Sequence, residues 1–593
     1  MKRVVSILLS LMLLSATVFA GTEKISPDLL PYLNSNQQVQ VVVQYAPGTA
    51  PNCSGLLGAV SCLLNGVLKL LSQIPLVGDV VAVVDGTGLL NLSNQANVVY
   101  ISKDRPLTNL LSNAAPAINA QAAWNAGYTG TGIGVALLDS GVNTHKDFTS
   151  PSSTSSRIVY NKSLVPGNTS TADQYGHGTH IAGLIAGDGA SSTGNPYLLT
   201  FTGIAPGAKI VNFRVLDANG AGTDSSLIAA IMQAIALKSK YNIRVINLSL
   251  GRPVYESYKL DPVCKAVELA WKNGIVVVVA AGNNGRYQGT NGYGTITSPG
   301  NDPYVITVGA MKPMGTPDRS DDLIASYSSK GPTLIDHIVK PDIVAPGNLL
   351  VSTETTSTNL YTGEPANRVP LSYYMVAGSS SIYSTTYFTL SGTSMATGVV
   401  SGVVADLLQA HPTLTPDQVK ARLMKTAYKT FPKSSSVFDP TTGITYTDQY
   451  DIFTVGAGYV DVAAALANND LATGTAMSPV AQYDSTSGNY YLYRDPSSVW
   501  GNSAMWGSTV VYGNQVLVPS SAMWGSTTTS GSSAMWGSSA MWGSSAMWGS
   551  SNSTGYSTIW TNSAMWGSSA MWGSSAMWGS SAMWGSSVSR GEN

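Results

Sequence analysis

The chain has 593 residues, which is too many for one ordinary domain, so about two to four domains are expected. Its formal net charge of −1 excludes a general electrostatic attraction to nucleic acid or to an acidic membrane. Charged residues make up only 11% of the chain and 60 residues are glycine. This departure from an average cytosolic protein is concentrated near the C-terminus.

The first 20 residues are typical of a secretory signal peptide. A basic start, Met1-Lys2-Arg3, precedes an apolar run from Val4 to Phe19, and Val18 and Ala20 suit cleavage after Ala20. A retained membrane anchor is the alternative, but the run is short and ends at this cleavage site. We therefore expect the protein to be secreted, either to the periplasm or out of the cell.

Residues 37–108 are predicted to form a small α+β unit. Their apolar pattern indicates strands at 39–45, 80–84 and 97–101, an apolar helix at 56–71 and a helical turn at 89–94. Asn65 and Lys69 interrupt the apolar helix, which favours a core helix over a membrane span. The polar stretch 102–106 is typical of an exposed linker that is open to proteolysis.

The chain has three cysteines. Cys53 and Cys62 could pair locally in an oxidising compartment, which would leave Cys264 free. Three cysteines in a chain of this size form neither a disulfide scaffold nor a zinc-ligand cluster.

Short apolar strands then alternate with helical stretches. The strands are expected at 134–139, 210–213, 245–250, 275–279 and 305–308, and the helices at 226–237, 262–272 and 415–426. This alternation predicts a parallel sheet that is covered by helices on both faces. The first strand delivers Asp139 at its carboxyl end, where functional groups gather in open α/β sheets. The folded pattern ends near Asn468.

The segment from Leu390 to Thr397, Leu-Ser-Gly-Thr-Ser-Met-Ala-Thr, places a serine at the start of a helix whose apolar positions continue to Leu407. The unpaired N–H groups of a helix N-terminus favour negative charge. Ser394 could therefore attack a carbonyl, and its own N–H could help to hold the resulting oxyanion. A Gly-x-Ser before a helix is more often only an N-cap, so the chain must also supply a base, an orienting acid and a second oxyanion donor.

Three further motifs offer these groups. Asp139 begins Asp-Ser-Gly-Val, His177 lies in Gly-His-Gly-Thr-His, and Asn283 lies in Ala-Ala-Gly-Asn-Asn-Gly. Each motif also has a simpler interpretation: Asp139 can be a strand-end cap, and Asn283 can be a turn residue. His177 and His180 could bind a metal, but no glutamate accompanies them as in a zinc-protease motif, and His180 is more readily a structural histidine. None of these interpretations explains all four motifs in this order.

In their order Asp, His, Ser, these motifs resemble those of the subtilisin-like serine protease family, over residues 118–468. The resemblance implies an α/β fold with a doubly wound parallel sheet and Ser394 as the nucleophile. It implies that His177 is the general base, and later the acid for the leaving amine, while Asp139 holds its imidazole in the useful tautomer. The side chain of Asn283 would donate to the oxyanion beside the N–H of Ser394. No metal ion is assigned to the chemistry.

The resemblance extends to the substrate-binding segments. Ser249-Leu250-Gly251 resembles the edge to which the substrate backbone adds as an antiparallel strand. Pro299 matches the family pattern, whereas Thr297 stands where many members have glycine, and we expect a pocket for medium-sized apolar side chains. The predicted substrate-binding residues are Ser249, Leu250, Gly251, Ala281, Gly282 and Thr297.

Two features depart from the family pattern. Gly398-Val399 stand where the family usually has Pro-His, and we expect altered local rigidity without loss of the chemistry. Asp147 matches one carboxylate ligand of the structural calcium that many members bind, but the loop after Gly187 does not reproduce the usual calcium loop. Structural calcium is therefore possible, and no cofactor is required for the chemistry.

The C-terminal end has a different character. Residues 496–589 contain no Lys, Arg, Asp or Glu, and the tetrapeptide Ala-Met-Trp-Gly recurs nine times. Eleven of the 13 tryptophans lie in this tail. Exposed tryptophans could bind cell-envelope glycan, and uncharged strands could self-associate. A stalk without a ligand and removal during maturation are the alternatives.

We divide the chain into a signal peptide (1–20), an inhibitory, foldase-like propeptide (21–110), a subtilisin-like catalytic domain (111–470) and a repeat tail (471–593). The sequence predicts a secreted serine endopeptidase, made as a self-processing zymogen that is cut after Ala20 and again within 103–118. Its partners would be polypeptide substrates and its own propeptide, and not nucleic acid. The alternative is a surface-binding or self-assembling repeat protein whose protease domain serves only processing or delivery. A third possibility, an inactive protease domain, is disfavoured by the intact motifs.

Overall fold

The structure is a computed structural model, and it divides the chain into two compact units, 1–107 and 108–593. It describes residues 22–46, 48–49, 69–73, 80–103, 111–149, 155–376, 380–439, 442–484, 489–493, 510–512, 515–516, 551–552 and 592. The predicted signal peptide, Cys53 and Cys62 lie outside the described residues. Within the described ranges, no helix is both long and apolar enough to span a bilayer.

The N-terminal unit contains a four-stranded antiparallel sheet in the order β2-β3-β1-β4. Alternate residues of β1 turn inward and pack with Leu89 and Leu92 of helix α3, because successive side chains of a strand point to opposite faces. Its elements are η1 (Thr22–Lys24), η2 (Pro27–Tyr32), β1 (Val39–Tyr45), β2 (Lys69–Gln73), β3 (Val80–Val84), α3 (Gly86–Ser93) and β4 (Val98–Lys103).

The predictions for this unit that fall on described residues hold except for the end of one helix. The strands at 39–45, 80–84 and 97–101 and the turn at 89–94 are confirmed with small shifts. The helix predicted at 56–71 lies mostly outside the described residues, but its end is wrong, because residues 69–73 pair with β3. This pairing with a strand later in the chain overrides the local apolar pattern.

The second unit is built on an eight-stranded sheet in the order β11-β10-β9-β8-β5-β7-β6, with β12 paired to β10. All of its pairings are parallel except that of β11. After β5 the chain runs to β6 at the edge, returns to β7 beside β5, and then crosses to β8 on the other side. The carboxyl end of β5 is therefore the topological switch point. The strands are β5 (Gly134–Asp139), β6 (Ile158–Ser163), β7 (Lys209–Arg214), β8 (Ile243–Leu248), β9 (Val276–Ala280), β10 (Ile306–Lys312), β11 (Leu323–Ile324) and β12 (Ile343–Pro346).

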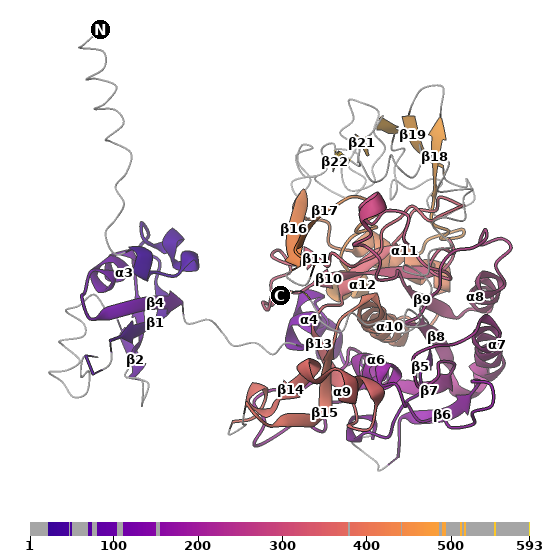
Figure 1. Cartoon of the computed structure of the whole chain (residues 1–593), viewed down its shortest axis with the longest axis horizontal. Coiled ribbons are helices and arrows are strands. Elements are labelled where there is room, and N and C mark those ends of the chain that lie inside the picture. Colours follow the sequence, from indigo (N-terminus) through magenta and orange to yellow (C-terminus); the bar gives the residue numbers. More distant parts are fainter. Residues whose placement is uncertain are drawn as a thin grey trace, which may run out of the picture. The chain divides into compact units, whose positions relative to one another are not determined.

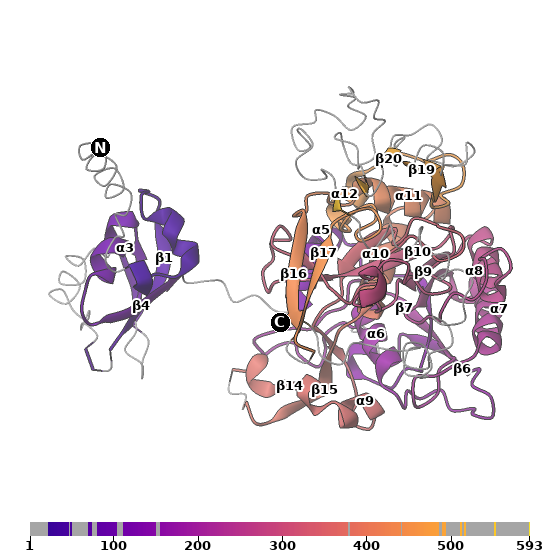
Figure 2. The same cartoon turned by 45° about the horizontal axis from the view of Figure 1, so that its top comes forward.

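Helices cover both faces of this sheet (Figures 1 and 2). Helix α10 packs against α6 on one face, and α7 packs against α8 on the other. The side chains of Thr223 and Asp261 accept backbone N–H groups at the starts of α7 and α8, which fixes where these helices begin. The helices are α4 (Leu111–Ala117), α5 (Gln121–Asn125), α6 (His177–Ala186), α7 (Asp224–Tyr241), α8 (Pro262–Lys272), α10 (Thr393–Ala410), α11 (Pro416–Thr426) and α12 (Val462–Ala467).

This arrangement confirms the predicted doubly wound α/β sheet. All five predicted strands and all three predicted helices form, with ends that differ from the prediction by at most four residues. They form as predicted because the strands are buried on both faces and therefore read as continuous apolar runs, as in β5 and β9.

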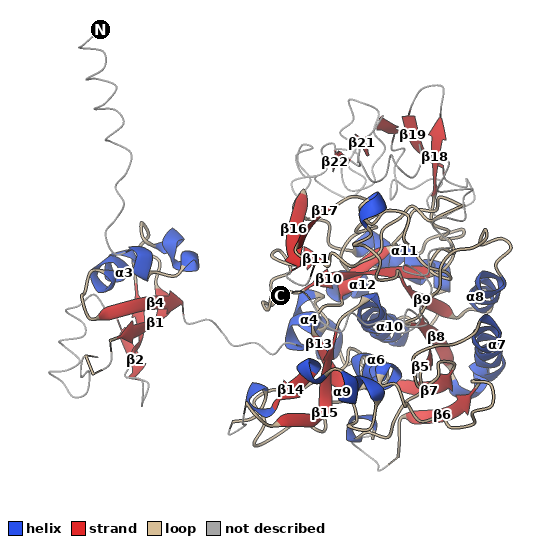
Figure 3. Cartoon of the chain, in the orientation of Figure 1, coloured by secondary structure: helices blue, strands red, loops and turns tan. Residues whose placement is uncertain are grey.

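Smaller elements surround the main sheet (Figure 3). A three-stranded antiparallel sheet leads directly into the Ser394 turn, and a β-hairpin follows α11. These elements are η3 (Lys146–Phe148), η4 (Gln288–Thr290), β13 (Leu350–Thr353), α9 (Asn359–Gly363), η5 (Pro365–Asn367), β14 (Arg368–Pro370), η6 (Leu371–Tyr373), β15 (Tyr383–Leu390), β16 (Ser434–Asp439) and β17 (Ile444–Gln449).

The folded unit continues past the expected end near Asn468. The hydroxyl of Ser478 donates to Asp342, and the N–H of Ala481 donates to the carbonyl of His337. An antiparallel sheet follows, with strands β18 (Val480–Asp484), β19 (Asn489–Tyr493), β20 (Val510–Tyr512), β21 (Gln515–Val516) and β22 (Ser551–Asn552). The Ala-Met-Trp-Gly copies lie outside the described residues.

Candidate active site

Asp139 lies at the carboxyl end of β5, at the switch point of the sheet, and is fully buried. Its Oδ1 accepts the Nδ1–H of His177 at 2.8 Å and the N–H of Ser140 at 2.7 Å. Because an ionised carboxylate can only accept hydrogen bonds, the imidazole must carry its proton on Nδ1. That tautomer leaves the Nε2 of His177 as a proton acceptor.

His177 is the first residue of α6, and glycines allow the helix to start this close to β5. Gly176 has φ 112°, and a Cβ added there would lie 2.6 Å from Oε2 of Glu354. A Cβ at position 178 would lie 2.2 Å from the carbonyl oxygen of Gly141. Only glycine fits these two positions, which explains the Gly-His-Gly spacing of the motif.

Asp173 holds the same helix in place, and sequence analysis missed it. Its carboxylate accepts the N–H of Gly176 at 2.7 Å, the N–H of Thr179 at 2.7 Å and the hydroxyl of Ser140 at 2.8 Å. Burial raises the pKa of Asp173, and these hydrogen bonds oppose that rise. The available signal was an acidic residue shortly before the start of a helix, which is typical of a cap.

The two histidines of α6 have different protonation chemistry. Burial is the largest single effect and lowers the pKa of His177, but the charge and hydrogen bond of Asp139, together with the charge of Asp173, act against it, and the pKa is raised overall. Burial, and then the charge of His177, lower the pKa of His180 to about 3. The Nε2 of His180 lies 3.1 Å from the carbonyl oxygens of both Leu350 and Phe388, so it must carry the proton. This geometry supports a structural role for His180 and not a metal pair with His177.

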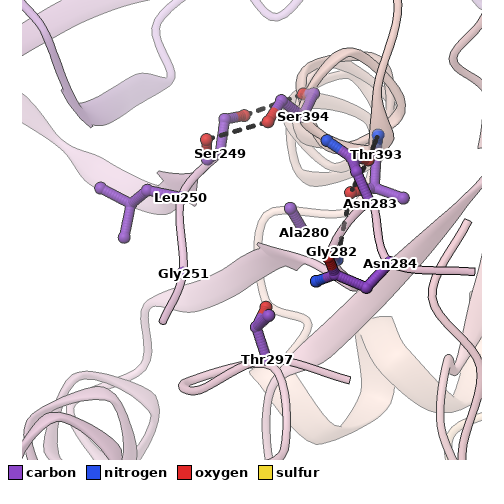
Figure 4. A pocket seen from close by; sticks show the side chains of 10 residues that line it. All are labelled: Ser249, Leu250, Gly251, Ala280, Gly282, Asn283, Asn284, Thr297, Thr393 and Ser394. Carbon is purple, nitrogen blue, oxygen red and sulfur yellow. Dashed lines mark hydrogen bonds between the residues drawn. The ribbon is translucent and has the colours of Figure 1, made fainter. Parts of the chain in front are cut away.

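Ser394 is the second residue of α10, the helix that packs against α6. Its hydroxyl donates to the carbonyl of Ser249 at 3.0 Å, and the Ser249 hydroxyl donates to the carbonyl of Ser394 at 2.8 Å (Figure 4). Within the described part of the chain, the buried Nε2 of His177 makes no hydrogen bond. The bond between Ser394 and His177 is thus not made in this structure, and such bonds often tighten only when substrate binds.

Asn283 faces the start of α10. Its Oδ1 accepts the N–H of Thr393 at 2.9 Å and the Thr393 hydroxyl at 3.0 Å, and that hydroxyl accepts the N–H of Gly282 at 3.1 Å. These bonds fix the orientation of the amide, with Oδ1 toward the start of the helix. Thr393, which precedes Ser394 in the serine motif, is therefore the residue that orients Asn283.

A pocket with an empty volume of about 320 Å³ opens beside Ser394 (Figure 4). All of the predicted substrate-binding residues line it except Ala281, whose carbonyl instead accepts the N–H of Thr297 at 3.1 Å. Ala280 and Asn284 line the pocket and were not predicted. The lining residues are Ser249, Leu250, Gly251, Ala280, Gly282, Asn283, Asn284, Thr297, Thr393 and Ser394.

The side chain of Thr297 narrows this pocket. A Cβ added at Gly251 would lie 2.5 Å from the Oγ1 of Thr297, and one added at Gly282 would lie 2.9 Å from its Cγ2. The threonine therefore fills the space between two glycine-containing walls. The backbone of Arg252 pairs with that of Ser298 next to it.

Comparison with known proteins identifies the family of the chain. Residues 130–458 match the model of the subtilase family. The chain is 38% identical over 343 residues to serine protease AprX of Bacillus subtilis, which covers 56% of this chain and 70% of that protein. It is 33% identical over 371 residues to M-protease of Shouchella clausii (62% of this chain, 74% of that protein) and 32% identical over 365 residues to subtilisin E of Bacillus subtilis (60% and 78%).

The chain belongs to the subtilase family. It is a subtilisin-like serine protease, and its substrates are polypeptides. The family of peptide hydrolases was the one expected from the four motifs, and that expectation is confirmed. Subtilases need no cofactor for their chemistry.

Gly398, one of the departures from the subtilase pattern, lies where α10 contacts α6. A Cβ at this position would lie 3.3 Å from the Cγ2 of Ile181 and 3.5 Å from the Cβ of Leu184. Helix α10 runs without interruption through Gly398 to Ala410. The glycine thus lets the two helices that carry the histidine and the serine approach closely.

The residues around Asp147 do not fit the calcium ion that the family resemblance left possible. Its Oδ1 accepts the N–H of Ser191 at 2.7 Å, and its Oδ2 accepts the Tyr387 hydroxyl at 2.7 Å. The guanidinium of Arg157 donates to the carbonyl oxygens of Asp147 and Ala186. Both carboxylate oxygens and the neighbouring carbonyls are therefore occupied by protein donors, and an arginine already supplies the positive charge.

Proposed function

We propose that this subtilase is a secreted endopeptidase that cleaves peptide bonds through Ser394, His177 and Asp139, with Asn283 as an oxyanion donor. One observation supports this assignment above the others. Asp139 and His177 are hydrogen-bonded, Asn283 and Ser394 line one pocket, and the elements that carry Asp139, His177 and Ser394 (β5, α6 and α10) pack against one another, although these residues are far apart in sequence. A set of separate structural roles does not explain this convergence.

In the first half of the reaction, the Oγ of Ser394 forms a bond to the carbonyl carbon of the substrate while the Nε2 of His177 takes the hydroxyl proton. The carbonyl oxygen becomes negative and accepts hydrogen bonds from the N–H of Ser394 and the side-chain amide of Asn283. The C–N bond then breaks, and His177 gives its proton to the leaving amine. The result is an acyl-enzyme on Ser394 and a free amine product.

In the second half, His177 takes a proton from water, and the hydroxide attacks the acyl carbon. The same two donors hold the second oxyanion, and its collapse returns the proton to Ser394 and releases the carboxylic acid. Asp139 carries no proton in either half, because its role is to hold the imidazole tautomer and to stabilise the imidazolium. No metal ion takes part.

The pocket takes a medium-sized apolar side chain of the substrate. The side chain of Thr297 narrows the pocket, while Leu250 and Ala280 add apolar lining. Ser249 to Gly251 offers backbone groups on one wall, to which an extended substrate adds as a strand. A preference for cleavage after Arg or Glu in a peptide library would contradict this assignment.

The enzyme is made as a zymogen. The separate N-terminal unit, a small antiparallel sheet with a helix, is the propeptide that acts as foldase and inhibitor, and the enzyme removes it by cleavage within 103–118. The signal peptide of residues 1–20 directs export. The family membership favours this account over one in which the tail is the functional part and the protease serves only delivery.

Expression of the wild-type chain and of Ser394→Ala, followed by intact-mass measurement, tests the proposal. The wild type should lose its N-terminal unit and degrade casein, whereas the variant should stay unprocessed and inactive. A trace of wild-type enzyme added to the variant should then remove the N-terminal unit in trans. Equal processing of both chains without added enzyme would show that another protease does the cutting and would overturn self-processing.

A further inference from the structure

The second-last residue of the chain, Glu592, is buried in the catalytic unit and is only 4% exposed. The Oε1 of its carboxylate accepts the Nη2–H of Arg286 at 2.8 Å and the N–H of Ser326 at 3.0 Å, and the Ser326 hydroxyl also donates to it. Three donors on one carboxylate oxygen, one of them cationic, make a strong and directional site.

The backbone of Glu592 is recognised as well as its side chain. The Nδ2 of Asn348 donates to the carbonyl of Glu592 at 2.8 Å, and the N–H of Glu592 donates to the Oδ1 of Asn348 at 2.9 Å. Asn348 is itself buried, with 3% exposed. Its amide pairs with both backbone groups of one residue, as a neighbouring strand would. The site therefore selects a glutamate at one defined position of the chain.

The guanidinium of Arg286 is also held by residues other than Glu592. The Nη1 of Arg286 pairs with Asp439 at 3.1 Å, its Nε donates to the Ser326 hydroxyl at 2.8 Å, and its guanidinium lies 5.0 Å from the centre of the Tyr446 ring. Asp439 and Tyr446 belong to the β16–β17 hairpin. Because these contacts already orient the guanidinium, little side-chain entropy is lost when the glutamate binds.

The site lies next to the segments that carry the oxyanion residues. Arg286 is three residues after Asn283, and the N–H of Gly285 donates to the carbonyl of Tyr327, the neighbour of Ser326. Asn348 follows Gly347, whose carbonyl accepts the N–H of Gly392 just before the Ser394 helix. Glu592 thus contacts three segments that are continuous with, or hydrogen-bonded to, the segments that carry Asn283 and Ser394.

We propose that Glu592 is a latch that fastens the segment following the Ala-Met-Trp-Gly repeats to the catalytic unit, and that Arg286, Ser326 and Asn348 form a receptor for a glutamate-containing peptide of that segment. The chain is bonded to the catalytic unit at Ala481 and again at Glu592. The repeats lie in the sequence between these two attachment points. The latch does not depend on the catalytic chemistry proposed above.

The test uses the full chain in its Ser394→Ala form, with a recognition site for a sequence-specific protease inserted after residue 553. After cleavage, the C-terminal fragment should co-elute with the catalytic unit in gel filtration. Excess synthetic peptide of residues 589–593 should release it, and the same peptide with Glu592→Gln should be at least about 10-fold less effective, because a charged hydrogen-bonding partner is lost.

Variants of the chain provide matched controls. In the cleavable chain, Glu592→Gln should weaken retention of the fragment, whereas Glu256→Gln, which removes a carboxylate elsewhere on the same unit, should not. Release of the fragment from the unmutated chain would overturn the latch. The latch would also be overturned if the fragment stayed bound in the presence of either peptide and in the Glu592→Gln chain. Other parts of the tail would then hold the fragment.

Discussion

The Nδ1 of His177 donates to the Oδ1 of Asp139 over 2.8 Å, although the two residues are 38 positions apart in the chain. Both side chains are fully buried, so water does not compete for this bond. The carboxylate raises the pKa of His177 against the lowering effect of burial. The pair therefore sets both the tautomer and the basicity of the proposed general base.

Asp139→Asn should lower kcat by about 10⁴-fold, because the amide no longer holds the reactive tautomer. The wild-type acid limb of kcat/KM should lie above the ordinary histidine pKa, since His177 must lose its proton to act as a base. Without the carboxylate, only the charge of Asp173 still opposes the effect of burial on the pKa of His177, and the limb should move to lower pH. Profiles of kcat/KM against pH check this, with the exposed Asp470→Asn as control, and an unmoved limb in Asp139→Asn would contradict the account.

Asn283→Leu should lower kcat by about 10²–10³-fold with little change in KM, the loss typical of one oxyanion-hole donor in subtilisin. Thr393→Val tests the orienting bonds separately, because it removes the hydroxyl that donates to Oδ1 but keeps the Asn283 amide. Thr393→Val should lose less kcat than Asn283→Leu. Steady-state kinetics on one peptide substrate decide the matter, and a rise in KM alone for Asn283→Leu would assign the residue to substrate binding.

Thr297→Gly should widen the pocket, since the threonine side chain fills the space between Gly251 and Gly282. We compare kcat/KM for two substrates that have phenylalanine or alanine just before the cleaved bond. The ratio of the phenylalanine value to the alanine value should rise by about 10-fold or more. Thr295→Ala, a buried threonine that does not line the pocket, should leave the ratio unchanged. An unchanged ratio in Thr297→Gly would show that another residue limits the pocket.

Asp173→Ala should cost about 1–2 kcal/mol of stability, because the N–H groups of Gly176 and Thr179 lose their buried acceptor. Urea denaturation of the Ser394→Ala form, with and without the change, measures this free energy. Asp318→Ala, which removes a cap from an exposed turn, should cost much less. Equal costs for the two changes would mean that Asp173 does not hold the start of α6.

The sequence predicts those parts of the fold that depend on local patterns of apolar and capping residues. The buried strand that ends at Asp139 and the helix at 262–272 follow directly from apolar runs and caps. The end of the helix predicted at 56–71 was wrong, because residues 69–73 pair with a strand later in the chain, which a local pattern does not reveal.

The site was predictable at the level of motifs and less so at the level of single contacts. Ala280 lines the pocket in place of Ala281, because the last residue of β9 sets which side chain faces the cavity, and an apolar run does not define that register. The hydroxyl of Ser394 donates to Ser249, a choice among nearby acceptors that sequence does not encode locally. The bonds of Asp173 to Gly176 and Thr179 are local and had a signal in the sequence, whereas its bond to the Ser140 hydroxyl forms only when β5 and α6 meet.

The central claim is that Ser394 is the nucleophile, and labelling with a fluorophosphonate followed by peptide mass spectrometry tests it most directly. The adduct should lie on the peptide that contains Ser394 and should form at least about 100-fold more slowly in His177→Ala, which lacks the general base. Ser394→Ala should not be labelled. An adduct on a different serine, or labelling that persists in Ser394→Ala, would contradict the account.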